Sequence, residues 1–100
     1  MNFQKEGTFY FTLKTPDSDW ATNNKEYDFG SIGGGGIGIV ARKLPDYQLE
    51  LTIDGPLNKQ FVALAPIPQI NDKGLRVHIT WKKRHLNVYF NGKIVYSERV

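Results

Sequence analysis

The feature that most constrains this chain is an alternation of apolar and polar residues with a period of two. Every second side chain is apolar in residues 47–54 and again in residues 75–82. Phe9, Phe11 and Leu13 continue the pattern near the N-terminus. A half-buried β-strand requires this spacing, whereas an amphipathic helix needs apolar residues three and four positions apart. No segment of ten or more residues has the helical spacing, so the sequence predicts an all-β protein.

Turn residues divide the chain into strands. Asn91-Gly92 is flanked by two strand-like runs, and a type I′ hairpin turn favours this dipeptide because both central residues need positive φ. A two-residue turn also sets the pairing of its strands, which we expect to be Phe90 with Lys93, Tyr89 with Ile94, and Val88 with Val95. Residues 33–38 contain a G-x-G-x-x-G motif, but too few residues follow it for the helix of a nucleotide-binding unit. We therefore expect these glycines to form a turn between strands.

The turns and alternating runs together predict the architecture. We expect about eight strands, at residues 8–14, 26–32, 36–43, 47–54, 60–65, 75–82, 86–91 and 93–99. Strands at this spacing predict an antiparallel β-sandwich or barrel. A chain of 100 residues allows one domain, which we assign to residues 1–100.

Composition and motifs narrow the function classes. The chain is 40% hydrophobic and 23% charged, as in an ordinary soluble globular domain. Its apolar runs are far shorter than the ~20 residues that span a membrane, and we expect neither a signal peptide nor a membrane segment. The absence of cysteine excludes disulfides, thiolate metal sites and a cysteine nucleophile. Because P-loop, G-x-S-x-G and H-E-x-x-H motifs are also absent, we expect a protein without catalytic activity.

Charge is unevenly distributed along the chain. Residues 1–50 carry five Lys/Arg against seven Asp/Glu, whereas residues 51–100 carry eight against three. The basic excess is concentrated at Lys82–His85. Basic clusters can bind phosphates, but a nucleic-acid interface needs a broader basic face. We therefore interpret this cluster as a solvated hairpin turn and do not expect nucleic acid as a partner.

The polar loop at residues 16–24 is the first candidate binding site. Trp20 would stack on a sugar ring, while Asn23 and Asn24 would hydrogen-bond its hydroxyl groups. Asp17 and Asp19 supply the oxygen ligands that calcium prefers, although their spacing is not that of an EF-hand. The alternative is an ordinary polar loop in which Trp20 covers the core.

The polar sides of two strands form the second candidate site. Gln48 and Glu50 lie on the polar side of one strand, and Arg76 and His78 lie on that of another. If these strands are neighbours in one sheet, the four side chains form a single polar face for a ligand.

Tyr89, Ile94 and Tyr96 form the third candidate, an apolar group expected on the non-core face of the C-terminal hairpin. These side chains would stack on a sugar or form an interface with another copy of the chain. A cross-strand aromatic cluster without a ligand is the alternative.

Residues 75–95 resemble part of the laminin-G-like and concanavalin A-like lectin/glucanase domains. Those families have a strand of the type His-x-Ile-Thr-Trp, to which residues 78–81 (His-Ile-Thr-Trp) are similar without the intervening residue. A short turn and a strand similar to Val-Tyr-x-Asn-Gly-Lys at residues 88–93 follow. Residues 7–14 and 29–39 resemble their earlier strands more loosely. The resemblance implies a jelly roll of two antiparallel sheets that recognises glycans or proteins, sometimes with calcium, outside the cell or on a particle surface.

This chain departs from the family pattern in three ways. It is shorter than most of these domains, it lacks the Glu-x-Asp-x-x-Glu motif of the glucanases, and no set of its residues matches the calcium ligands of the family. From the resemblance we expect a carbohydrate-binding module without catalysis, whose sheet edge is covered by a protein partner or by a second copy in a homo-oligomer. The alternative is a structural or assembly protein that self-associates through a sheet face or an edge strand.

Overall fold

A computed structural model describes residues 6–14, 25–34, 36–68 and 74–99 of the chain. They form eight strands: β1 Glu6–Leu13, β2 Tyr27–Gly34, β3 Ile37–Leu44, β4 Gln48–Asp54, β5 Gln60–Pro66, β6 Leu75–Lys82, β7 His85–Phe90 and β8 Lys93–Arg99. Helical structure in these residues is limited to η1, a 3-10 turn at Pro56–Asn58. None of the described segments contains a helix long and apolar enough to cross a lipid bilayer. The predicted all-β class is confirmed, and every strand boundary lies within two residues of its expected position.

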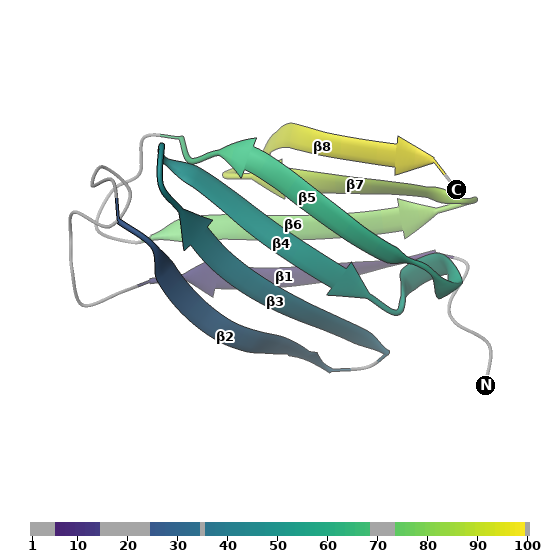
Figure 1. The fold of residues 1–100 in the computed structure, drawn as a ribbon. Coiled ribbons are helices and arrows are strands. Elements are labelled where there is room, and N and C mark those ends of the chain that lie inside the picture. Colours follow the sequence, from purple (N-terminus) through teal and green to yellow (C-terminus); the bar gives the residue numbers. More distant parts are fainter. Residues whose placement is uncertain (1–5, 15–24, 35, 69–73, 100) are drawn as a thin grey trace.

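The strands form two antiparallel sheets that pack face to face (Figure 1). Sheet A has the order β1-β6-β7-β8, and sheet B has the order β2-β3-β4-β5. Consecutive strands pair with each other in both sheets, while β1 joins sheet A by pairing with β6. The predicted antiparallel sandwich is confirmed at this level, whereas the jelly-roll topology stays a prediction.

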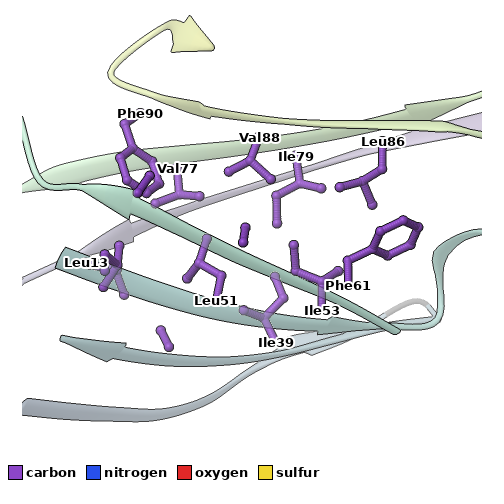
Figure 2. Packing of buried hydrophobic residues seen from close by; sticks show 14 of the residues in the cluster. Leu13, Ile39, Leu51, Ile53, Phe61, Val77, Ile79, Leu86, Val88 and Phe90 are labelled. Atoms are coloured by element: carbon purple, nitrogen blue, oxygen red, sulfur yellow. The ribbon is translucent and has the colours of Figure 1, made fainter. Parts of the chain in front are cut away.

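The core lies between the two sheets and consists of the apolar half of each alternating strand (Figure 2). Leu51 and Ile53 of β4 face Val77 and Ile79 of β6, and each of these side chains is at most 1% exposed. Burial of one such side chain contributes about 1.5–3 kcal/mol. Because the apolar side of each strand is buried, the alternate side chains form two outer faces, one on each sheet.

Both hairpin turns of sheet A are two-residue turns in the left-handed region. Asn91 and Gly92 have φ of 51° and 84°, which confirms the turn predicted from this dipeptide. Lys83 and Arg84 have φ of 49° and 71° in the turn between β6 and β7. The basic cluster is therefore a hairpin turn, as the sequence predicted.

The register between β7 and β8 departs from the prediction after the first two pairs. Val88 pairs with Tyr96 instead of Val95, because Val95 is the extra residue of a β-bulge. Tyr96 therefore lies on the same side of the sheet as Val88 and packs against the core. The prediction that Tyr89, Ile94 and Tyr96 share the non-core face is wrong for Tyr96, since a period of two does not count a bulged residue.

Tyr96 also takes part in a polar cluster that closes one side of the sandwich. Glu98 of β8 accepts a hydrogen bond from the Tyr96 hydroxyl and forms an ion pair with Lys59, which directly precedes β5. We name Lys59, Tyr96 and Glu98 the edge clasp, because they connect an edge strand of each sheet. Lys59, with a smaller contribution from Tyr96, holds the pKa of Glu98 below its ordinary value. Burial and the neighbouring Glu98 raise the pKa of Tyr96 to about 12.

Candidate functional site on the outer face of sheet A

The structure separates the residues of the second predicted site. Gln48 and Glu50 lie on the outer face of sheet B, whereas Arg76 and His78 lie on the outer face of sheet A. The hydrophobic core lies between the two pairs, so the single polar face expected from these four residues is wrong. The alternation correctly showed that all four point away from the core, but it carries no information on which strands become neighbours.

The first predicted site lies beyond what the structure describes. Trp20, Asn23 and Asn24, together with Asp17 and Asp19, fall in residues 15–24, outside the described ranges. Their roles in sugar or calcium binding therefore stay predictions. Among the described residues, no group of three or more His, Asp or Glu side chains is arranged to hold a metal ion.

His78 instead joins residues of β1, β7 and β8 in one of three rows that run across sheet A, while Arg76 pairs with Thr12 of β1. The first row, which we name the aromatic row, consists of paired residues from the four strands: Tyr10, His78, Tyr89 and Ile94. The polar row, the next row on the same face, consists of Thr8, Thr80, Asn87 and Ser97. The charged row, at the far end of the strands, consists of Glu6, Lys82, His85 and Arg99.

Ring contacts fix the side chains of the aromatic row. The rings of Tyr10 and His78 stack with centroids 4.0 Å apart and planes 19° from parallel. His78 also contacts Tyr89, at 5.4 Å between ring centroids and an angle of 35°. Tyr10 lies on an edge strand and remains 67% exposed. The row therefore presents a preformed aromatic surface whose outermost ring is open to solvent.

A pocket of about 370 Å³ lies at the β1–β6 end of this row. Its walls come from Tyr10, Thr12, Arg76, His78 and Gly92, and Phe11 and Val77 line it as well. Arg76 connects the pocket to the hairpin turn: its N–H donates to Asn91 Oδ1 at 3.0 Å, and its carbonyl accepts from the Asn91 N–H at 2.8 Å. These two bonds hold the turn against β6, so that the pocket wall at Gly92 has a defined position.

The Nε2 atom of His78 is the unsatisfied polar group of this site. It is buried, and no described residue forms a hydrogen bond with it. Leaving a buried polar atom unpaired costs about 1–3 kcal/mol, and native structures contain few such atoms. Because Nε2 is closed to solvent, a hydroxyl group of a bound ligand would pair with it only after the side chains that cover it shift.

Hydrogen bonds also order the polar row. Ser97 Oγ donates to Asn87 Oδ1 at 2.8 Å. Because its hydrogen is used in this bond, Ser97 Oγ accepts from His85 Nε2, with which it is also in contact. The amide nitrogen of Asn87 keeps its two donors for other partners. The row thus offers fixed hydrogen-bonding groups of the kind that sugar hydroxyls pair with.

The two outer faces carry opposite net charge in the described residues. Apart from histidine, the charged side chains on the outer face of sheet A are Glu6, Arg76, Lys82 and Arg99. Those on the outer face of sheet B are Asp28, Arg42, Glu50 and Asp54. Cations outnumber anions by two on sheet A, and anions outnumber cations by two on sheet B. The candidate site therefore lies in the more positive half of the molecule.

Sequence reasoning found Arg76 and His78 but missed Tyr10 and Thr12 as members of a site. Tyr10 carries a hydroxyl group and lies between Phe9 and Phe11, so the alternation of residues does show that its side chain points outward. That it stacks on His78 depends on the pairing of β1 with β6, two strands from opposite ends of the chain. No local signal in the sequence specifies this pairing.

A comparison with protein-family models finds no match to this chain, and comparisons with curated proteins and with solved structures likewise find none. We therefore infer the function from the chemistry of the two outer faces.

Proposed function

We propose that this protein is a carbohydrate-binding module without catalysis, with its binding site on the outer face of sheet A. The observation that carries the proposal is the unpaired, buried His78 Nε2 beside the exposed ring of Tyr10 in one pocket. A sugar ring has an apolar face that packs on an aromatic side chain and hydroxyl groups that pair with buried polar atoms. Tyr10 and His78, which would make these two contacts, both line this pocket.

The proposal extends to the fold family. We propose a lectin-like jelly roll of the concanavalin A-like or laminin-G-like kind, supported by the motif at residues 75–95 and by the two packed antiparallel sheets. In this proposal Arg76 and His78 keep the ligand-binding role expected from the sequence, and Tyr10 and Thr12 join them. Tyr89 continues the aromatic surface toward Ile94.

The test is glycan-array screening followed by titration calorimetry with the best glycan. Tyr10→Ala removes the exposed stacking surface, so we expect affinity to fall about tenfold, the equivalent of 1.4 kcal/mol. Tyr27→Ala is the matched control, because Tyr27 is an exposed tyrosine at 42% exposure on sheet B. Absence of binding to any glycan, or equal losses in the two variants, would contradict the proposal.

A second candidate function is self-association through the outer face of sheet B. Val40 and Val62 lie on either side of Thr52 in one cross-strand row, with Leu64 nearby, and the three aliphatic side chains are 46%, 51% and 52% exposed. The adjacent row places Arg42 opposite Glu50. Two copies packed about a two-fold axis would bury the aliphatic residues and bring Arg42 of each copy to the acidic residues of the other.

Light scattering over a concentration series tests this second candidate. We expect a dimer whose dissociation is promoted by Val62→Lys, which puts a charge into the apolar row. Ile94→Lys is the matched control, since Ile94 is 51% exposed on the outer face of sheet A. A monomer at all concentrations, or the same effect from both variants, would contradict self-association through sheet B.

A further inference from the structure

We infer that the glycan recognised on sheet A is an acidic one, with the carboxylate of a sugar acid bound at Arg76. This inference rests on the proposed carbohydrate-binding function and specifies the class of ligand.

Arg76 is placed to receive an anion at the pocket. Its side chain is exposed and lines the pocket, and none of the described lining residues is acidic. Two ion pairs between described residues join Arg42 with Glu26 and Lys59 with Glu98, and neither uses Arg76. A guanidinium group offers a planar pair of N–H donors that matches a carboxylate. The backbone bonds to Asn91 hold this residue in place beside Tyr10 and His78.

The spacing of positive charge on this face favours a saccharide over a nucleic acid. Arg76 and Lys82 lie on the same side of β6, six residues apart, which corresponds to about 20 Å along the strand. The aromatic and polar rows between them carry no Lys or Arg side chain. A nucleic acid has a negative charge on every nucleotide and needs cations along its whole path. A saccharide with hydroxyl groups between separated acidic groups fits this pattern better.

The outer face of sheet B differs from that of sheet A in net charge, and this difference also favours an acidic ligand on sheet A. The excess of acidic residues on its outer face repels an anionic polymer, while the cations of sheet A attract it. An acidic glycan is therefore directed to the face that carries the pocket and the aromatic row.

The experiment compares four probes on the intact protein by titration calorimetry: a polyuronate, its methyl-esterified form, a sulfated polysaccharide and a single-stranded oligonucleotide. We expect the polyuronate to bind at least tenfold more tightly than the other three, because only a free carboxylate on a sugar matches both Arg76 and the neighbouring aromatic surface. Tighter binding of the sulfated polysaccharide or the oligonucleotide would overturn the inference.

Substitutions at Arg76 test the residue itself. We expect Arg76→Gln to weaken polyuronate binding roughly ten- to hundredfold, as for a charge-assisted hydrogen-bonded pair, and Arg76→Lys to weaken it less. Arg42→Gln, on sheet B, is the matched control and should leave binding unchanged. Equal affinity of Arg76→Gln and the unchanged protein for polyuronate would overturn the role of Arg76.

The outcomes separate this inference from the proposed function. If the esterified and free forms bind equally and Tyr10→Ala weakens both, the carbohydrate-binding function holds and the acidic ligand is wrong. If no saccharide binds, the proposed function itself fails. Far-ultraviolet circular dichroism of each variant verifies that the fold is retained.

Discussion

The outer faces of sheets A and B differ in chemistry although both belong to four-stranded antiparallel sheets that share one core. On sheet A the outward side chains form rows of aromatic, hydroxyl-bearing and cationic residues, with a pocket beside Tyr10. On sheet B the corresponding positions hold exposed aliphatic side chains such as Val40 and Val62 among acidic residues. Outward side chains contribute little to the core, so each face can acquire its own chemistry without a change of fold. In our proposals, ligand recognition belongs to sheet A and self-association to sheet B.

The largest expected effect comes from the core that both faces share. Leu51→Ala removes a fully buried side chain at the centre of β4, so we expect the free energy of unfolding to fall by about 2–5 kcal/mol. Thr52→Ala, one residue further and on the outer face of sheet B, should change it by no more than about 0.5 kcal/mol. Urea denaturation measures both, and similar losses would contradict the division between core and outer face.

A smaller effect of opposite sign is expected at His78. Replacing this residue with leucine removes the unpaired buried Nε2, so we expect His78→Leu to raise the free energy of unfolding by about 1 kcal/mol. The same variant should lose glycan binding, because the ligand then has no imidazole to pair with. Thr52→Val is the control on sheet B, where no such gain is expected. A less stable His78→Leu variant that still binds glycan would be evidence against the site on sheet A.

The smallest effect concerns the edge clasp that connects the two sheets. The folded-state pKa of Glu98 is lowered, so its contribution to stability is present above its unfolded pKa and is lost as the pH falls through the folded pKa. We expect the melting temperature to fall less in acid for Glu98→Gln than for the unchanged protein. Glu50→Gln, on sheet B, should retain the acid dependence of the unchanged protein. Superimposable pH profiles of Glu98→Gln and the unchanged protein would contradict a stabilising clasp.

The clasp also predicts behaviour at alkaline pH. The pKa of Tyr96 is raised from 10.0 to about 12, so its contribution to stability is present below pH 10 and is lost as the pH rises toward 12. Spectrophotometric titration of tyrosine ionisation should show one late-ionising group that disappears in Tyr96→Phe. A titration curve that does not change in this variant would contradict the assignment.

The strands and turns of this protein are predictable because the sequence patterns that specify them extend over only a few residues. Alternating runs located β4 and β6, and Asn91-Gly92 located the last hairpin. The predicted positions of site residues are wrong where they depend on pairing between distant strands or on a β-bulge, because the local alternation describes neither. The alternation predicts Gln48 and Glu50 beside Arg76 and His78 because all four are outward and polar, yet the strands that carry the two pairs belong to different sheets.

The β-bulge at Val95 produced the other error. One extra residue in β8 moves Tyr96 from the outer side to the core side, where its hydroxyl reaches Glu98. Residues 93–99 contain no glycine or proline that would indicate an irregularity, so the alternation predicts an unbroken strand there. The stack of Tyr10 on His78 was likewise not predictable, because it requires the first strand to pair with the sixth.

Residue order over a few positions is enough to specify which segments are strands, where the chain turns and which side chains avoid the core, because backbone sterics and hydrophobic burial act at that range. The neighbours of each outward residue are a different matter. They depend on strand pairing between distant segments, on the packing of the two sheets and on one bulge, and these set the pocket of Tyr10, Arg76 and His78. The local alternation of apolar and polar residues therefore specifies the fold class, while the candidate site forms only when the two sheets have assembled.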